Sequence, residues 1–254
     1  MNASDPPLPT DSPDHDPLRD AILVTGAGRR IGLHIATRLL DEGHAVIAHY
    51  RSPTPELTEL AGRGAVCIQA DLADAGQVRE LAASILRTTA SLRAIIHNAS
   101  DFARTSSDMD EALDQMERFM AIHVSAPYAL NTLLKARLEA TSAKLADIIQ
   151  ITDIFADRPN PVFDVYCASK AASQNLALSF ARRLAPRIKS NIIQPGPVLF
   201  KEWHGPEARE SVLKETPLGV EGGVDPIWIA VRGLLDNPYQ TGSVIQVDGG
   251  RRLS

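Results

Sequence analysis

The chain has 254 residues, 44% of them apolar, and a formal net charge of −5. A chain of this length and apolar content can bury one large core, so we expect a single domain. The acidic balance excludes a surface dedicated to nucleic acid or to an anionic membrane, because either would need a basic excess. Small molecules are therefore the expected ligands.

The N-terminal segment, residues 1–20, combines proline, aspartate and serine without an apolar block. It can bury little surface, so we expect it to be disordered and the folded domain to span residues 21–254. It lacks both the apolar core of a signal peptide and the arginine-rich character of a transit peptide. Two cysteines, Cys67 and Cys167, are too few for a disulfide framework. No apolar run of about 18 residues follows, and we expect a soluble cytoplasmic protein.

From residue 21 onward, short apolar runs alternate with longer segments of helical periodicity. A strand followed by a helix, repeated along the chain, predicts a parallel sheet with helices on both faces. In such sheets ligands bind beyond the carboxyl ends of the strands, so polar motifs that follow strands are the candidates for function. The expected strands are residues 21–25, 44–50, 65–71, 92–99, 147–153, 188–194 and 243–249.

The first expected strand runs into the stretch TGAGRRIG, residues 25–32. Gly26 can supply a tight turn, and Gly32 allows the following helix to pack closely on the strand. This leaves the helix N-terminus free to hold a phosphate. An ordinary strand-to-helix turn explains the motif equally well by itself, but its place in the first strand-helix unit favours nucleotide binding.

The second expected strand ends in HYRS, where an NAD site would carry an acidic residue for the ribose 2′-hydroxyl. Arg51 and Ser52, with Arg29 or Arg30 nearby, suit a 2′-phosphate instead, because a guanidinium pairs with phosphate oxygens and an acid would repel them. A solvated basic turn is the alternative. Together with the glycine-rich turn, this pattern favours NADPH over NADH.

A long helix is expected over residues 164–185, and Tyr166 and Lys170 share one face of it at i and i+4. A neighbouring ammonium stabilises phenolate, so we expect it to lower the tyrosine pKa and make Tyr166 a proton donor. A carboxylate, Asp153, stands upstream at the end of the fifth strand. In isolation, a tyrosine and a lysine at this spacing are more often an unremarkable exposed pair.

The joint pattern resembles the short-chain dehydrogenase/reductase family over residues 21–254. The resemblance implies a single doubly wound (Rossmann) domain with a seven-stranded parallel sheet, and an assembly that is usually a tetramer. The motifs that carry it, besides the first turn, are Asn98-Ala99-Ser100, Tyr166-x-x-x-Lys170 and Pro195-Gly196.

Four positions depart from the general family pattern. Arg30 replaces the middle glycine of T-G-x-x-x-G-x-G, and Ser100 replaces the glycine of N-A-G. Asp153 takes the place of a serine, and His123 that of an asparagine. The first three changes resemble the pteridine reductase branch of the family. Stretches such as GRRIGL, LRAIIHNAS and DGGRRL resemble the bacterial dihydromonapterin reductases within it.

The resemblance implies a reaction, the reduction of the N5=C6 bond of a 7,8-dihydropterin. NADPH would supply a hydride to carbon, while the protein supplies a proton to nitrogen. In this branch of the family the tyrosine and the aspartate, here Tyr166 and Asp153, face the pterin, and Lys170 holds the nicotinamide ribose. Phe102, in NASDF, matches the residue that stacks on the ring. The expected conversion is 7,8-dihydromonapterin to tetrahydromonapterin, with dihydrofolate to tetrahydrofolate as a weaker activity.

Two other functions compete with this one. A carbonyl reductase of the same family is disfavoured by Asp153, because a serine there normally hydrogen-bonds the carbonyl oxygen. A regulator that senses NADP(H) without turnover would be marked by a broken tyrosine-lysine pair, and this pair is intact. Which pterin side chain is accepted and what His123 does stay open.

The resemblance assigns the following site residues; we assign no metal site. The catalytic residues are Tyr166, Lys170 and Asp153. The substrate-binding residues are Arg30, Ser100, Phe102, Asp153 and Tyr166. The cofactor-binding residues are Gly26, Arg29, Arg30, Ile31, Tyr50, Arg51, Ser52, Asp71, Leu72, Asn98, Ala99, Ser100, Lys170, Pro195, Gly196 and Val198.

Overall fold

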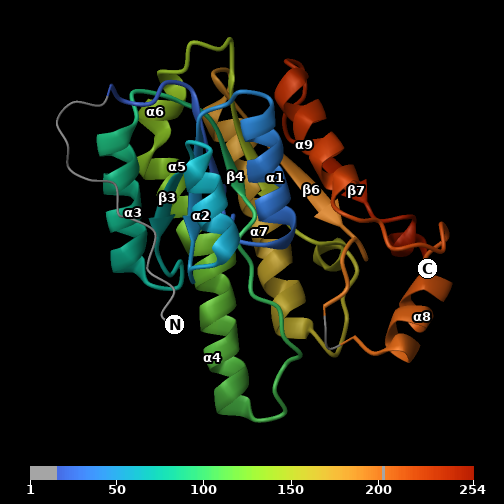
Figure 1. Ribbon diagram of the computed structural model, residues 1–254. Helices are drawn as coiled ribbons and strands as arrows, with labels where there is room; N and C mark the ends of the chain where they lie inside the picture. Colours follow the sequence, from blue (N-terminus) through green and yellow to red (C-terminus); the bar gives the residue numbers. More distant parts are fainter. Residues whose placement is uncertain (1–15, 202–203) are drawn as a thin grey trace.

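A parallel sheet forms the centre of the molecule (Figure 1). The computed structural model describes residues 16–201 and 204–254. Within these ranges the sheet has seven strands in the order β3-β2-β1-β4-β5-β6-β7, and every neighbouring pair is parallel, which confirms the predicted sheet. The strands are β1 (Ala21–Thr25), β2 (Val46–Tyr50), β3 (Val66–Gln69), β4 (Leu92–His97), β5 (Ala146–Ile151), β6 (Ile188–Pro195) and β7 (Val244–Val247).

Helices cover both faces of the sheet, as the alternation of elements predicts. α1, α2 and α9 pack on the face to which Ile22 and Val24 of β1 point, and α3, α5, α6 and α7 on the face of Ala21 and Leu23. Successive strand residues face opposite sides, so β1 is apolar and buried along its whole length. The helices are α1 (Arg30–Asp41), α2 (Pro55–Gly62), α3 (Ala75–Thr88), α4 (Met109–Met120), α5 (Ala126–Leu133), α6 (Lys135–Glu139), α7 (Asp164–Leu184), α8 (Pro206–Lys214) and α9 (Asp225–Asp236), with short turns η1 (Ala121–Ser125), η2 (Ile154–Ala156) and η3 (Arg251–Leu253).

The composition predicts that the folded domain begins at residue 21. In the structure it begins earlier. Leu18 forms a parallel bridge with Thr89, and the Asp20 carboxylate accepts a hydrogen bond from the Ser142 amide at 3.0 Å. The last residues of the segment expected to be disordered therefore belong to the domain. The rest of that expectation falls on residues 1–15, which lie outside the described ranges.

The carboxyl ends of the strands meet at one edge of the sheet. The chain winds from β1 through β2 to β3 on one side and continues from β4 on the other, so β1 and β4 flank the switch point. Ligands bind at this point in doubly wound sheets. The motifs that follow β1, β2, β4, β5 and β6 are thereby brought together. In the described ranges, no helix has the length and apolar character needed to cross a membrane.

Candidate active site

The turn after β1 packs tightly against the end of β4. Gly26 has a positive φ of 67°, and a Cβ there would lie 2.9 Å from the Cα of Ala99. A Cβ on Gly32 would lie 2.1 Å from the carbonyl oxygen of Gly26, so neither position accepts a side chain. The Asn98 side-chain amide donates to the carbonyl oxygens of Thr25 (3.0 Å) and Gly26 (3.2 Å). Asn98 therefore ties the two strand ends together.

Arg30 stands where the family pattern has glycine, and its backbone is in the left-handed region (φ 54°). This conformation costs a non-glycine residue about 1–3 kcal/mol unless its surroundings hold it. Its guanidinium donates to the carbonyl oxygens of Leu199 (2.6 Å) and Phe200 (3.3 Å), in the segment after β6. Arg30 thus links the first turn to that segment, while Arg29 beside it is exposed.

The N-terminus of α1 fits a phosphate group. The first turn of this helix carries no acidic side chain, so nothing in that turn competes with an anion for the positive end of the helix dipole. Arg29 precedes the helix and Arg30 begins it. Both the basic residues and the backbone N–H groups at the start of this helix suit the pyrophosphate of a dinucleotide.

Beyond the ends of β2 and β3, four charges of alternating sign form a row. Arg51 donates to the Asp101 carboxylate at 3.0 and 3.2 Å. The same carboxylate accepts from Arg118 Nε at 2.8 Å, and Arg118 pairs with Asp71 at 3.4 Å. The Arg51 side chain is 45% exposed, and Ser52 next to it is also exposed. Both are accessible to a ligand at the end of β2.

Several predicted cofactor residues are buried in the cores beside the sheet. Tyr50 and Val198 lie in the cluster that includes α1, and Leu72 lies in the cluster on the opposite face. Ile31 is half-buried against the first of these. Since the Leu72 side chain packs inward, its backbone groups are the part of this residue that a cofactor can contact.

The turn after β6 is fixed against the end of β7. Pro195 ends β6, and the Gly196 amide donates to the carbonyl oxygen of Val247 at 3.0 Å. A Cβ on Gly196 would lie 2.7 Å from the Cα of Asp248. The Val198 amide donates to the Gly196 carbonyl oxygen at 2.8 Å. The close approach explains the glycine, because any side chain would separate the two strand ends.

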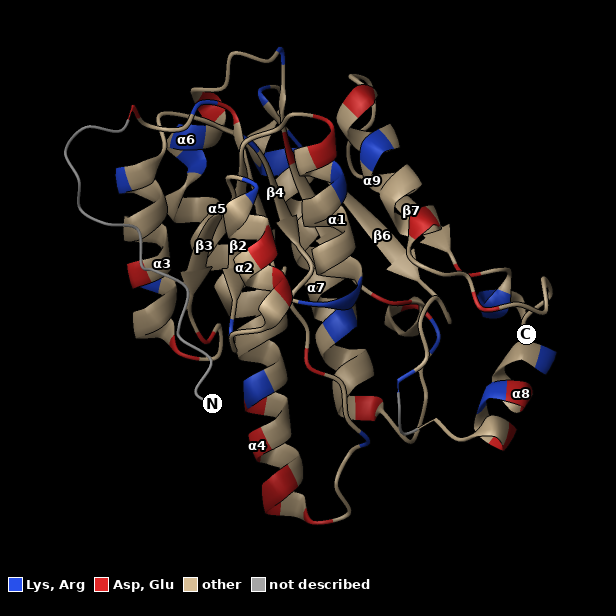
Figure 2. Cartoon of the chain, viewed as in Figure 1, with Lys and Arg blue, Asp and Glu red and all other residues tan. Residues whose placement is uncertain are grey.

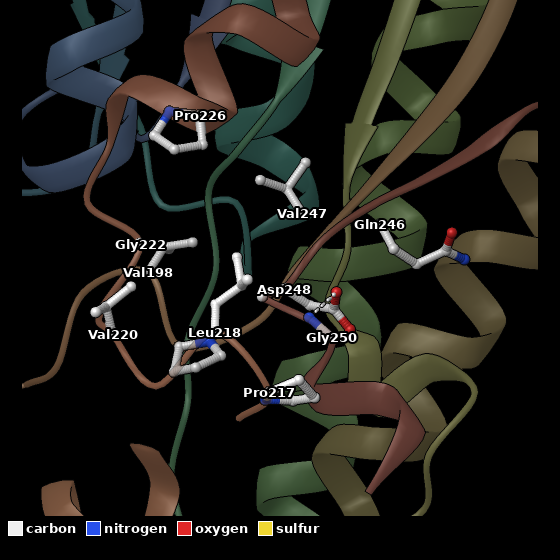
Figure 3. A pocket seen from close by; sticks show the side chains of 12 residues that line it. Val198, Pro217, Leu218, Val220, Gly222, Pro226, Gln246, Val247, Asp248 and Gly250 are labelled. Atoms are coloured by element: carbon white, nitrogen blue, oxygen red, sulfur yellow. Dashed lines mark hydrogen bonds between the residues drawn. The ribbon is translucent and has the colours of Figure 1, made fainter. Parts of the chain in front are cut away.

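A cavity of about 460 Å³ lies beside this turn (Figure 3). Apolar side chains predominate around it, among them Val198, Pro217 and Leu218. Tyr166 and Asp153 are not among its lining residues. The cavity therefore adjoins the predicted nicotinamide turn and is separate from the catalytic side chains.

The three predicted catalytic residues lie together at the end of β5 and on α7. The Tyr166 hydroxyl donates to Asp153 Oδ2 at 3.0 Å. Lys170 Nζ lies 5.5 Å from the Tyr166 ring centroid and 3.4 Å from the carbonyl oxygen of Ile151. Asp153 also accepts from the Phe155 amide at 2.9 Å, which orients its carboxylate at the start of η2. All of the side chains of this trio are held by packing or hydrogen bonds.

Burial dominates the electrostatics of this trio. It raises the pKa of Tyr166 well above its usual value, and the Asp153 carboxylate raises it further. It lowers the pKa of Lys170 to about 8, against the attraction of Asp153. Burial also raises the pKa of Asp153, opposed by the Phe155 amide, Lys170 and Tyr166. The expectation of a lowered tyrosine pKa is therefore wrong for this structure, since burial and the Asp153 carboxylate raise the pKa of Tyr166.

Phe102 lies in an aromatic cluster beside the catalytic trio. Its ring stacks on Phe163, with centroids 4.7 Å apart, and meets the Tyr166 ring edge to face at 4.7 Å. Lys201 Nζ lies 4.7 Å from the Phe102 centroid and donates to the Phe102 carbonyl oxygen at 3.3 Å. Sequence motifs did not single out Phe163 or Lys201, because neither belongs to a conspicuous pattern.

His123 is buried next to the same trio, with 1% of its surface exposed. It lies in the π-helical turn η1 between α4 and α5, and its ring centroid is 5.8 Å from that of Tyr166. Burial and the nearby Lys170 lower the pKa of His123 well below its usual value. The imidazole is therefore neutral.

Comparison with known proteins places this site in a family. The sequence matches the family described as enoyl-(acyl carrier protein) reductase over residues 26–252. The chain belongs to this family, among the short-chain dehydrogenases/reductases. It is 40% identical to dihydromonapterin reductase from Klebsiella pneumoniae over 232 residues, which cover 91% of this chain and 96% of that one. The corresponding Escherichia coli K12 enzyme is 38% identical over the same shares of the two chains.

Solved structures of short-chain dehydrogenases/reductases share the fold. FolM alternative dihydrofolate reductase 1 from Brucella canis, complexed with NADP, superimposes with a TM-score of 0.83 at 32% identity, covering 92% of this chain and 94% of that chain. The Brucella suis protein, also in complex with NADP, gives the same TM-score and identity. The predicted family and the predicted doubly wound fold are confirmed.

Proposed function

We propose that this protein catalyses the NADPH-dependent reduction of a dihydropterin, converting 7,8-dihydromonapterin to tetrahydromonapterin, with dihydrofolate as a weaker substrate. The observation that carries the proposal is the hydrogen bond from Tyr166 to Asp153 beside the ring of Phe102. The names of the Klebsiella, Escherichia and Brucella relatives support the same chemistry. Their similarity extends over more than nine tenths of the chain, which supports a shared domain.

The trio provides the proton that the reaction consumes. When bound, NADPH supplies a hydride to C6 of the dihydropterin. The Tyr166 phenol remains protonated over the neutral range and delivers its proton to N5. Asp153 orients the phenol, and the Lys170 ammonium offsets the negative charge that the transfer leaves on the pair. Phe102 and the nicotinamide enclose the flat pterin and set its distance from the hydride.

Most of the proposed cofactor contacts come from residues in the turns that follow β1, β2 and β6. The turn between Gly26 and Gly32 holds the pyrophosphate at the start of α1, and Arg51 with Ser52 binds the 2′-phosphate of NADPH. A phosphate carries more charge than the Asp101 carboxylate with which Arg51 now pairs. Lys170 binds the nicotinamide ribose, and the backbone after Pro195 meets the carboxamide.

We further propose that the protein works in the cytoplasm as a homotetramer. Three apolar side chains of α4, spaced by one and two helical turns, are exposed: Met109 (71%), Leu113 (51%) and Met116 (41%). The same helix carries acidic residues, including Asp110 and Glu111 in its first turn (Figure 2). An exposed apolar stripe within a charged surface is typical of a contact between subunits.

The decisive experiment compares substrates. NADPH oxidation is measured in parallel with dihydromonapterin, dihydrobiopterin, dihydrofolate and a simple ketone. Turnover of the pterins, with dihydromonapterin preferred, is the expected result. Turnover of the ketone alone would refute the proposal and leave a carbonyl reductase. NADPH binding without turnover of any of the four would favour a sensor.

A further inference from the structure

Two of the departures from the family pattern contact each other. Ser100 Oγ lies 3.0 Å from His123 Nε2, although the family pattern has a glycine and an asparagine at these positions. On the other side of the ring, Ser169 Oγ lies 2.8 Å from His123 Nδ1. The imidazole thus bridges two hydroxyl groups inside a π-helical turn, an element that occurs frequently at functional sites.

The bonds of Ser169 decide which nitrogen of His123 carries the proton. Ser169 Oγ lies 2.7 Å from the backbone carbonyl oxygen of Tyr166. That oxygen is an acceptor, so the single hydroxyl proton of Ser169 lies between them. Ser169 must then accept from His123 Nδ1, and Nδ1 carries the imidazole proton. His123 Nε2 then carries no proton, and it accepts a hydrogen bond from the Ser100 hydroxyl.

The opposite tautomer is less favourable. It would turn the Ser100 proton toward the carbonyl oxygen of Asp101, 3.2 Å away, and leave Ser169 Oγ facing the Tyr166 carbonyl oxygen at 2.7 Å with no proton between them. Two acceptors repel more strongly at the shorter distance. The shorter contact therefore selects the tautomer protonated on Nδ1.

We propose that His123 is a positioning residue that holds the Ser100 hydroxyl proton away from the substrate, so that Ser100 offers the pterin an acceptor. The inference rests on the proposed function, because it concerns the pterin bound beside Ser100. Ser100 adjoins the reacting groups, because the His123 ring that it contacts lies 5.8 Å from the Tyr166 ring, centroid to centroid.

His123 does not conduct protons in this arrangement. Its chain of hydrogen bonds ends at Ser169, which is 1% exposed and whose own proton is bound to a backbone carbonyl. A backbone carbonyl cannot pass a proton on. The neutral imidazole is a fixed dipole, and its effect on the reaction is to set the direction of one hydroxyl group.

The ligand class follows from the direction of that hydroxyl. An oxygen that keeps its lone pairs toward the site binds an N–H group, such as an amino substituent of a pteridine, and disfavours a carbonyl oxygen. 2,4-Diaminopteridine, whose exocyclic groups are donors, should therefore bind the NADPH complex more tightly than lumazine, whose exocyclic groups are acceptors.

Two substitutions of His123 test its two ring nitrogens separately, because each variant keeps the hydrogen bond of one nitrogen and loses that of the other. In His123→Asn the amide nitrogen takes the δ position and can still donate to Ser169, but Ser100 loses the imidazole acceptor at 3.0 Å and keeps only the carbonyl oxygen of Asp101 at 3.2 Å. In His123→Gln the amide oxygen reaches the ε position and can accept from Ser100, while the bond to Ser169 is lost. His123→Asn should reduce the ratio of the two pteridine affinities by about five- to tenfold, the amount that one hydrogen bond supplies. His123→Gln should change it by less than about twofold.

The ratio of the two pteridine affinities distinguishes a positioning role of His123 from a packing role, because a loosely packed site would weaken the binding of both ligands equally. Equal losses for the two pteridines in His123→Asn, or the same change of ratio in both variants, would overturn the inference. Ser100→Ala is the matched control, and adding His123→Asn to it should leave the ratio unchanged. If the unmodified protein binds NADPH but neither pteridine, the proposed function itself fails, and that outcome is separate from an unchanged ratio in the variants.

Discussion

The Tyr166 hydroxyl donates its hydrogen bond to the Asp153 carboxylate at 3.0 Å. A serine in place of Asp153 could donate to a substrate oxygen, whereas an ionised carboxylate only accepts. Burial and this carboxylate keep the pKa of Tyr166 well above its usual value. The free enzyme therefore carries the proton that reduction of a C=N bond consumes, in a group that does not lose it to solvent near neutral pH.

Removing the proton donor should stop the chemistry without removing the cofactor. We expect Tyr166→Phe and Lys170→Ala each to lower turnover by more than tenfold, since general-acid catalysis contributes about 100-fold or more. Lys170→Ala should weaken NADPH binding more than Tyr166→Phe does. Single-turnover rates and NADPH titrations measure the two effects. A near-normal single-turnover rate in Tyr166→Phe would exclude the tyrosine from the mechanism.

The pH dependence should reflect Lys170. Its pKa in the free protein is about 8 because the ammonium is buried, so the lysine is charged below this pH and loses its charge above it. The value of kcat/KM for NADPH, which reports groups of the free enzyme, should therefore fall as the pH rises through about 8. In Lys170→Arg, whose guanidinium keeps its charge, this alkaline fall should disappear even if the rate is lower. A profile of the unmodified enzyme that stays level to about pH 9.5 would contradict the assignment.

Arg51 should discriminate between the two nicotinamide cofactors. In Arg51→Glu an acid faces the 2′-phosphate, so NADPH should lose about 10- to 150-fold in affinity, the equivalent of roughly 1.5 to 3 kcal/mol, and NADH far less. Asp101→Asn is the complementary variant, because it removes the carboxylate that now pairs with Arg51. NADPH should then bind several-fold more tightly. Equal losses of both cofactors in Arg51→Glu would mean that Arg51 does not contact the phosphate.

The assembly should depend on the apolar stripe of α4. Leu113 is 51% exposed in the single chain, so Leu113→Glu should leave the fold intact while placing a charge inside the proposed contact. The expected result is a smaller particle in light scattering, with the circular dichroism spectrum of the unmodified protein. Lys135→Glu, on the distant helix α6, serves as a charge-change control. A monomeric unmodified protein would refute the tetramer.

The sequence predicts the sheet well because buried parallel strands are short, apolar and separated by helical periodicity. The predicted strand 44–50 becomes Val46–Tyr50, and 188–194 becomes Ile188–Pro195. The sequence also predicts the contact of Tyr166 with Lys170, because both residues lie on one helix at positions i and i+4. The start of the fold differs from the predicted residue 21, because composition does not reveal that Leu18 pairs with Thr89, a residue far along the chain.

The remaining features of the site depend on contacts between distant segments. Asp101 meets Arg51 and Arg118 only because the ends of β2 and β4 and the side of α4 converge, and no spacing in the sequence encodes this. The rise in the pKa of Tyr166 comes from burial, which is a property of the folded molecule. His123 departs from the family pattern, but neither motif predicts its contact with Ser100.

Asp153 and Phe102 separate a pterin reductase from a carbonyl reductase. A carboxylate beside the tyrosine would repel the negative charge that develops on a reduced carbonyl, but it can accept from a pterin ring or orient the proton donor. Asp153→Ser should therefore strongly impair dihydropterin reduction. Phe102→Ala should weaken pterin binding by roughly 1 to 3 kcal/mol through lost stacking and apolar contact.

Two titrations test this pair of variants, first NADPH alone and then an antifolate-type pterin analogue on the NADPH complex. NADPH affinity should barely change in either variant, because neither side chain is assigned to the cofactor. Phe102 also packs on Phe163 and Tyr166, so Phe163→Leu is the control for a general loosening of the aromatic cluster and should weaken the analogue less than Phe102→Ala does. Unchanged analogue affinity in Phe102→Ala, together with full dihydropterin turnover in Asp153→Ser, would remove the structural argument for a pterin, leave only the family fold and return the preferred substrate to unknown.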